Sequence, residues 1–272
     1  MRRSNILGLL ALLSAMSAPA QQYGLPAMVR GVGIDQNLNA QLPLELTFKD
    51  ETGQIVRLGQ YFRQKPVILA FVYYECPMLC NMVLNGLTHS MEKSTLALGK
   101  DFEVVTVSIN PQEYWKLAAA KKLNYIEKYQ GTGSPDGWHF LTGQEENIKK
   151  LADAAGFHYK YEPISKQFAH ASGIMIATPD GRIARYFYGI EYNPRDLRLG
   201  LVEASQRKIG SPVDAIMLFC FHYDPTTGKY GFVIMNVIRT LGSATVIGLG
   251  AMLFIFIRRD RRRAHDDLGR PA

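Results

Sequence analysis

The sequence predicts a mixed α/β fold, in which helices flank a β-sheet, followed by one membrane-spanning helix. Two continuous apolar runs, at residues 66–73 and 102–109, have the length and composition of central strands buried on both faces. Segments with apolar residues at helical spacing alternate with these runs, which is the order typical of α/β proteins. The 272-residue chain is 47% hydrophobic and 20% charged, which excludes a disordered, collagen-like or disulfide-dense protein.

The first half of the chain contains a hairpin, the two central strands and two helices. Residues 44–48 and 55–58 have extended-strand patterns on either side of a turn at residues 50–53, which predicts the hairpin. Apolar residues at helical intervals predict a helix at residues 82–98. A second helix is expected at residues 111–129, because a proline opens it and a glycine follows its end.

The second half completes the sheet and makes it mixed. Residues 174–177 and 183–187 are apolar strands joined by the turn Pro179-Asp180-Gly181, which predicts an antiparallel hairpin. The remaining elements are a short strand at residues 138–141 and helices at residues 144–155 and 194–208.

The two ends of the chain carry targeting signals. Arg2 and Arg3 precede a short apolar stretch that closes on Ala18-Pro19-Ala20, the pattern of a cleaved secretory signal. Residues 241–257 contain no charge, and residues 237–257 are long enough to span a membrane because Arg239 can extend its charged end to the interface. Six arginines in the last fifteen residues predict a cytoplasmic flank.

The charge distribution predicts membrane topology and argues against a nucleic-acid partner. The formal net charge is +7, but most of it lies at the two ends and about +2 remains for residues 21–257. We therefore expect a protein of the bacterial inner membrane, with its folded domain in the periplasm and its C-terminus in the cytoplasm. The expected segments are a signal peptide (1–20), a linker (21–41), the folded domain (42–210), a membrane-proximal segment (211–236), the transmembrane helix (237–257) and a basic tail (258–272).

Two cysteines mark the candidate site. Cys76 and Cys80 follow the first central strand and open the next helix, where free amides and the helix dipole stabilise thiolate. Their spacing allows a reversible disulfide or a soft-metal site, and two thiolates prefer Cu(I) or Zn(II) to hard ions. A structural disulfide, or two buried apolar cysteines, is the alternative.

The motifs resemble one known family. The strand into Cys76-Pro77-Met78-Leu79-Cys80, the segment Phe168-Ala169-His170-Ala171-Ser172 and the Pro179-Asp180-Gly181 hairpin are similar to the Sco/SenC family of copper-binding thioredoxin-like proteins, over roughly residues 40–208. The resemblance implies a thioredoxin-like fold in which Cys76, Cys80 and His170 bind copper for delivery to the binuclear copper (CuA) centre of a cytochrome c oxidase subunit. Two sulfurs and one imidazole suit three-coordinate Cu(I).

The chain departs from the family pattern at three places. Asn81 replaces the proline that usually follows the second cysteine, and Asn110-Pro111 replaces Asp-Pro after the second central strand. The membrane anchor is expected at the C-terminus, whereas members are commonly anchored at the N-terminus. The first two positions help to shape the site, so the chain is expected to belong to a variant branch.

Other candidate residues are weaker. Cys220, His222 and Asp224 alternate along the chain and could form a second metal site, but a membrane-proximal strand with an incidental thiol is the favoured interpretation. Met78 and Met82 are expected to fill gaps in the core. The histidines at 89, 139 and 158 are expected to be ordinary helix or strand residues, and no catalytic role is assigned to Glu75.

Three functions compete at the cysteine pair. The first is a copper chaperone, and the second is a thiol–disulfide oxidoreductase that uses Cys76 and Cys80 as a redox pair on an oxidase subunit or another secreted protein. His170 discriminates between them, because redox exchange needs only the cysteines. A peroxiredoxin-like peroxidase is the weakest, because Tyr73 occupies the position where such enzymes place threonine three residues before the reactive cysteine.

Overall fold

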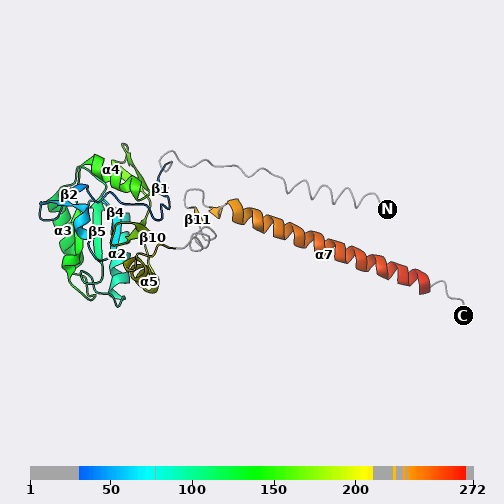
Figure 1. The fold of residues 1–272 in the computed structure, drawn as a ribbon. Coiled ribbons are helices and arrows are strands. Elements are labelled where there is room, and N and C mark those ends of the chain that lie inside the picture. Colours follow the sequence, from blue (N-terminus) through cyan, green and yellow to red (C-terminus); the bar gives the residue numbers. More distant parts are fainter. Residues whose placement is uncertain (1–30, 77, 211–222, 225–228, 231, 268–272) are drawn as a thin grey trace. The chain divides into compact units, whose positions relative to one another are not determined.

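The computed structural model of the chain describes residues 31–76, 78–210, 223–224, 229–230 and 232–267 (Figure 1). The chain divides into two units, of which the larger is Ala27–Ala215. The expected signal peptide, as well as Cys220 and His222, lies outside the described residues.

A five-stranded mixed sheet forms the centre of the larger unit. Its order is β10-β9-β4-β5-β6, in which β4, β5 and β6 are parallel while β9 and β10 run antiparallel to them. The strands are β4 (Val67–Val72), β5 (Glu103–Ser108), β6 (Trp138–Leu141), β9 (Gly173–Ala177) and β10 (Ile183–Tyr188). Every residue of β4 is buried, as expected for a central strand covered on both faces. The mixed α/β fold is confirmed.

Helices and smaller sheets surround this centre. Helix α5 contacts α2, β9 and β10, while α3 contacts β6 and α4 contacts β7. The helices are α2 (Leu79–Glu92), α3 (Trp115–Ile126), α4 (Glu145–Ala154) and α5 (Pro194–Ser205). The smaller sheets are the hairpin of β2 (Thr47–Lys49) with β3 (Ile55–Arg57), and a sheet of β1 (Gly33–Ile34), β7 (Phe157–Glu162) and β8 (Gln167–His170). A pair of two-residue strands, β11 (Tyr223–Asp224) and β12 (Lys229–Tyr230), lies outside the larger unit.

Helix α2 begins and ends earlier than the expected range of 82–98. It begins at Leu79, so that Cys80 already lies in its first turn, and it ends at Glu92. Leu98, which fits the helical spacing, is instead a buried loop residue whose backbone N–H donates to the carbonyl of Thr132. The apolar residues after Glu92 are therefore explained by burial of a loop and not by continuation of the helix.

Helix α3 is also shorter than the expected range of 111–129. Pro111 lies in a turn before the helix, because the side chain of Asn110 accepts a hydrogen bond from the backbone of Gln112 at 3.0 Å and the Glu113 N–H donates to the Asn110 carbonyl. Asn110 thus performs the turn-forming role that an aspartate would perform at this position. The turn ends at Tyr114, and the helix begins at Trp115.

The β7–β8 hairpin was not expected from the sequence. Its strands are only partly buried, and they carry aromatic and charged residues without a continuous apolar run. His170 is the last residue of β8. The lead-in before residue 42 is held against the domain, since Asp35 and Asn39 donate backbone hydrogen bonds to the carbonyls of Gly156 and Ile183.

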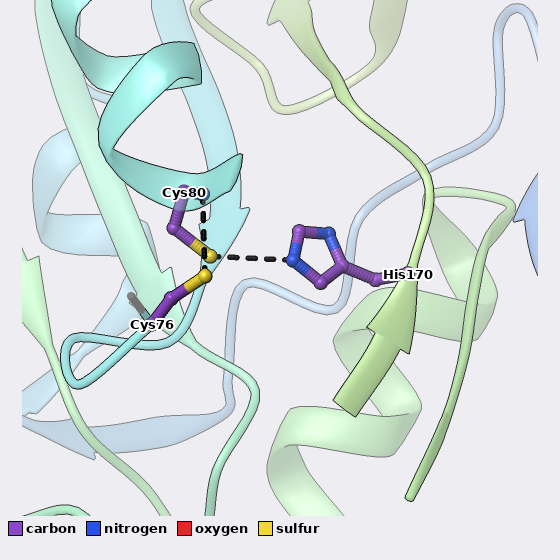
Figure 2. A group of neighbouring side chains, drawn as sticks. All are labelled: Cys76, Cys80 and His170. Carbon is purple, nitrogen blue, oxygen red and sulfur yellow. Dashed lines mark hydrogen bonds between the residues drawn. The ribbon is translucent and has the colours of Figure 1, made fainter. Parts of the chain in front are cut away.

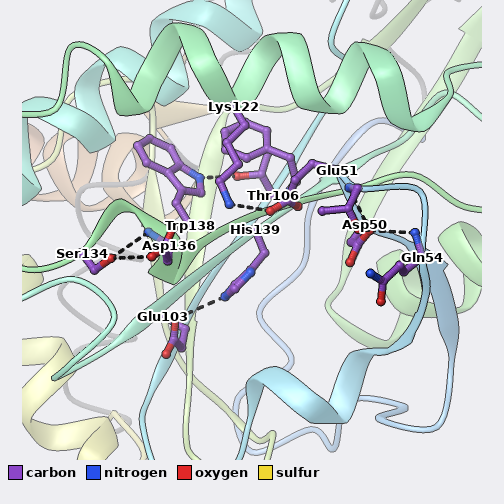
Figure 3. A network of polar contacts seen from close by, with 12 residues as sticks. Asp50, Glu51, Gln54, Glu103, Thr106, Lys122, Ser134, Asp136, Trp138 and His139 are labelled. Atoms are coloured by element: carbon purple, nitrogen blue, oxygen red, sulfur yellow. Dashed lines mark hydrogen bonds and ion pairs between the residues drawn. The ribbon is translucent and has the colours of Figure 1, made fainter.

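A polar network ties the hairpin β2–β3 to α3 and β6 (Figure 3). Glu51 accepts hydrogen bonds from Lys122 and from the backbone of Phe140, and the Trp138 indole donates to Thr106 at 2.9 Å. The Glu51 and Lys122 side chains are only 13% and 14% exposed. A half-buried ion pair of this kind fixes the position of the hairpin, because breaking it leaves a poorly solvated charge.

The second unit contains one long helix, α7 (Phe232–Asp267). Its segment Arg239–Arg259 spans 21 residues, with a mean hydropathy of 2.0, and is long and apolar enough to cross a membrane. Leu253 and Phe254 are among its exposed apolar side chains.

Candidate metal centre

Three elements bring the predicted site residues together (Figure 2). Cys76 lies in the loop after β4, Cys80 in the first turn of α2, and His170 at the end of β8. One donor atom from each residue lies within 4.8 Å of the others. Cys76 is 6% exposed and Cys80 is fully buried, so the two sulfurs are largely shielded from water. The cysteines are not bonded to each other.

The sulfurs are held by the backbone. The Cys80 N–H, at the start of α2, donates to Sγ of Cys76 at 3.4 Å, and the Tyr73 N–H donates to Sγ of Cys80 at 3.3 Å. The helix N-terminus therefore points its free amide at Cys76, the cysteine outside the helix, because the orphan N–H groups of the first turn face the preceding loop.

The hydrogen bonds of His170 fix its tautomer. Nδ1 lies 2.8 Å from the carbonyl oxygen of Ala171, which can only accept, so Nδ1 carries the proton. Nε2 then offers a lone pair, and it lies 3.2 Å from Sγ of Cys80. The ring packs against Tyr73 and Phe157 with centroids 6.0 Å away, which restricts its rotation.

The two cysteines differ in protonation. Hydrogen bonding from the Cys80 thiol lowers the pKa of Cys76 to about 3, and backbone amides add to this effect against the opposing effect of burial. The same interaction with Cys76, together with burial, raises the pKa of Cys80. Without metal, the pair is therefore a Cys76 thiolate beside a Cys80 thiol.

A buried carboxylate holds the loop that leads to Cys76. Glu113 accepts hydrogen bonds from the backbone N–H groups of Tyr74 and Glu75, at 2.8 and 2.9 Å, and from the Ser108 hydroxyl at 2.5 Å. Burial raises the pKa of Glu113, against the lowering effect of these donors. Glu75 itself has an exposed side chain, and its backbone N–H is the group that contacts Glu113.

A lysine and an asparagine hold the other side of the loop. Lys121 of α3 donates to the carbonyl of Tyr74 at 2.9 Å and to Oδ1 of Asn81 at 2.6 Å. The Asn81 amide donates in turn to the carbonyl of Cys76 at 3.3 Å. The residue that replaces the usual proline therefore connects the cysteine loop to helix α3. No local sequence pattern marks Glu113 or Lys121, because their importance depends on contacts across the fold.

The remaining candidates lie elsewhere. His139 and His158 pair with Glu103 and Asp35, at 3.3 and 3.1 Å, as ordinary strand residues. Met78 and Met82 are 67% and 39% exposed, so the expectation that they fill core gaps was wrong. Met82 faces solvent because the opposite face of α2, with Val83, Leu84 and Leu87, covers the core, and Met78 lies just before the helix.

The sequence is similar to a known protein family and to a bacterial relative. The sequence matches the SCO1/SenC family over residues 35–202. The SCO1 protein homolog of Bacillus subtilis (strain 168) is 24% identical over 157 residues, which cover 55% of this chain and 75% of the relative.

Solved structures are also similar to this chain. A candidate electron transfer protein from Aquifex aeolicus VF5 is 24% identical, with a TM-score of 0.55, and the match covers 63% of this chain and 96% of that protein. ScoI of Arabidopsis thaliana, solved with copper bound, is 18% identical with a TM-score of 0.47, covering 60% and 96% of the two chains. The Aquifex structure shares the fold, and the thioredoxin-like arrangement of the sheet and helices is confirmed.

Proposed function

The chain belongs to the SCO1/SenC family, and from this premise we propose that it is a membrane-tethered copper chaperone of the bacterial periplasm. Cys76, Cys80 and His170 hold Cu(I), and the protein delivers it to the CuA centre of a cytochrome c oxidase subunit. The observation that carries the proposal is the convergence of two sulfurs and one unprotonated imidazole nitrogen within 4.8 Å.

The donor set suits Cu(I) better than other common ions. Two sulfurs and an imidazole are soft or borderline donors, which hard cations such as Mg²⁺ and Ca²⁺ do not prefer. A structural zinc site takes four protein ligands, and only three metal-binding side chains converge here among the residues that the structure describes. Binding of Cu(I) displaces the Cys80 proton, so the loaded site has two thiolates and one neutral histidine.

The membrane setting supports the same role. The apolar segment Arg239–Arg259 is long enough to anchor the chain, and the basic tail after it favours a cytoplasmic C-terminus. An exported domain tethered to the inner membrane is suited to supplying a metal to a membrane-bound oxidase. A reporter that works only in the cytoplasm should be active when it is fused after Ala272. Activity of a reporter that works only in the periplasm, fused at the same place, would contradict this topology.

Copper titration of the reduced, full-length chain in detergent tests the proposal. We expect one Cu(I) per chain by competition with a chromogenic Cu(I) chelator. His170→Ala should weaken binding while leaving disulfide formation nearly intact, because only the imidazole is lost. His158→Ala is the matched control, since this histidine pairs with Asp35 outside the cluster. Equal affinity of His170→Ala and the wild type would remove His170 from the site.

The thiol–disulfide oxidoreductase is the second candidate, favoured by the unequal protonation of the two cysteines. The Cys76 thiolate could attack a substrate disulfide, and Cys80 could then resolve the mixed disulfide. The reduction potential of the pair, measured with and without Cu(I), separates the two functions. Metal bound only to the dithiol form makes that form harder to oxidise, whereas an unchanged potential would favour the oxidoreductase.

A further inference from the structure

Two exposed methionines lie at the start of helix α2. Met78 stands just before the helix and Met82 ends its first turn, and the backbone N–H of Met82 donates to the carbonyl of Met78 at 3.2 Å. Both side chains are exposed, at 67% and 39%, whereas Met91 of the same helix is fully buried. Met78 and Met82 therefore present their side chains to solvent, and filling of the core does not explain them.

These methionines adjoin the metal centre on both sides of Cys80. Each is two residues from Cys80 in the sequence, and the backbone N–H of Met78 hydrogen-bonds the sulfur of Cys76. The cysteines themselves are shielded, since Cys76 is 6% exposed and Cys80 is fully buried. An ion that approaches the start of α2 from solvent therefore meets exposed thioethers before it reaches the buried cysteine sulfurs.

The chemistry of the thioether suits Cu(I). A thioether is a soft, neutral donor, and soft sulfur donors select Cu(I) over hard cations. It has no proton to lose, so it accepts the ion without a protonation step. It also carries no negative charge, so two thioethers hold Cu(I) less tightly than two thiolates and a histidine do. A site of this kind captures Cu(I) and releases it to a stronger site nearby.

The spacing of the two methionines allows them to share one ion. Residues four apart lie on the same face of a helix, one turn from each other, and each methionine side chain has three rotatable bonds with which to adjust. His89 is also exposed on α2, but it lies two turns beyond Met82, roughly 10 Å along a helix, which is too far to complete the pair. Met82 also lines a groove of about 730 Å³ between α2 and residues 190–194, which leaves room for the group that brings the ion.

We propose that Met78 and Met82 form a transient Cu(I) site at the mouth of the metal centre, which receives the ion and passes it to the cysteine–histidine centre described above. The second step rests on the proposed function, whereas capture by the thioethers does not. Copper remains Cu(I) throughout, so no electron is transferred. A bond from Cu(I) to a thioether sulfur breaks as a bond to a cysteine sulfur forms, and the proton displaced from Cys80 passes to solvent.

Capture is tested on the full-length chain in detergent with Cys76→Ser and Cys80→Ser, so that only the weaker site remains. The methionine methyl groups are labelled with carbon-13, and Cu(I), which is diamagnetic, is added without oxygen. We expect the methyl NMR signals of Met78 and Met82 to shift, while the signal of Met91 stays in place because that side chain is buried. The variants Met78→Leu and Met82→Leu assign the two signals.

Transfer is tested by the rate at which the chain with its native cysteines takes Cu(I) from a chromogenic chelator in a stopped-flow instrument. The double variant Met78→Leu/Met82→Leu should load about tenfold more slowly, because it lacks the intermediate ligands. Its final affinity for Cu(I) should stay within about twofold of wild type, because the cysteine–histidine centre is intact. Met91→Leu is the matched control on the same helix and should load at the wild-type rate. Leucine and methionine are similar in volume, so these variants should fold.

A second measurement of capture covers the case in which the serine chain fails to fold, as judged by far-UV circular dichroism. The wild-type chain with one Cu(I) already bound then carries the test. A second equivalent of Cu(I) should shift the same two methyl signals, because the stronger site is filled.

The outcomes separate this inference from the proposed function. Unmoved methyl signals, or a double variant that loads at the wild-type rate, would overturn it. A double variant whose affinity falls as much as its loading rate would place the thioethers in the final site, which also contradicts a transient one. If the cysteine–histidine centre binds no Cu(I), the chaperone proposal fails, and the methyl signals of the serine chain still decide whether the thioethers capture the ion.

Discussion

Replacement of Glu113 tests how the cysteine loop is held. Its carboxylate receives the two backbone N–H groups that precede Cys76 and the hydroxyl of Ser108. Glu113→Ala removes all three hydrogen bonds and leaves the buried N–H of Tyr74 without its acceptor. Glu113→Gln keeps the shape, but its amide group can accept through only one of the two positions that the carboxylate uses.

The magnitude follows from these contacts. Hydrogen bonds to a charged group contribute about 1.5–3 kcal/mol each, but removing the carboxylate also removes the cost of burying it. We therefore expect Glu113→Ala to lower the free energy of unfolding by about 3 kcal/mol, which corresponds to a fall in Tm of roughly 6–12 °C for a domain of this size. Glu113→Gln should cost about half as much.

The pH dependence has a definite sign. Burial raises the pKa of Glu113 above its ordinary value of 4.5, so protonation of this group favours the folded state. Its contribution to stability is therefore fully present below the unfolded pKa and is lost as the pH rises through the folded pKa. The gap in stability between wild type and Glu113→Ala should be wider near pH 4 than near pH 7.

Thermal unfolding of the reduced full-length chain measures the effect. Glu127→Ala is the control, because the Glu127 side chain is exposed. The control should change Tm by no more than about 2 °C. A Glu113→Ala variant as stable as this control would refute the view that the buried carboxylate holds the loop.

Three further predictions concern the thiolate, the asparagine and the half-buried ion pair. Because the pKa of Cys76 is lowered to about 3, iodoacetamide should label Cys76 before Cys80, at a rate that barely changes between roughly pH 5 and pH 8. Mass spectrometry of the products measures this rate. A steep rise of the labelling rate with pH would contradict the prediction. Asn81→Pro should preserve α2, since proline is tolerated in a first helical turn. It removes the hydrogen-bonded bridge from Lys121 to the Cys76 carbonyl and should lower the free energy of unfolding by about 1 kcal/mol. An unchanged Tm would show that the bridge contributes nothing. Lys122→Met should destabilise the chain by about 3 kcal/mol, because it leaves the carboxylate of Glu51 half-buried and unpaired. Lys150→Met breaks an exposed pair with Glu146 and should cost under about 0.5 kcal/mol, so equal losses in the two variants would contradict the argument from burial.

Local patterns in the sequence were sufficient for the central strands, the antiparallel hairpin and the cysteine pair. A central strand buried on both faces must be continuously apolar, so residues 66–73 and 102–109 were predicted nearly to their observed bounds. The four-residue spacing of Cys76 and Cys80 predicted that their sulfurs lie close together at the start of a helix, because four residues span about one helical turn. The charge-free C-terminal run identified the apolar part of α7 by length alone.

His170 could be singled out only through resemblance to a family. It lies 90 residues beyond Cys80, and its strand β8 has no continuous apolar run, since the β7–β8 hairpin is partly exposed and pairs with β1 instead of joining the central sheet. The end of α2 was misplaced because the buried loop residue Leu98 imitates helical spacing, and the start of α3 was misplaced because Pro111 lies in a turn before the helix. The exposure of Met78 and Met82 likewise depended on which face of α2 covers the core.

Only the tertiary structure brought Glu113 and Lys121 to the site. Strands β4 and β5 are parallel neighbours, so the segments that follow their carboxyl ends meet at one edge of the sheet: the cysteine loop after β4, and the turn with Glu113 after β5. Lys121 reaches the same loop from α3, 40 residues after Asn81 in the sequence. No local pattern encodes such a contact, because a buried carboxylate or ammonium acquires its role from the groups that the fold places around it. The sequence alone thus marked the cysteine pair as the candidate site, and the fold determined which charges surround it.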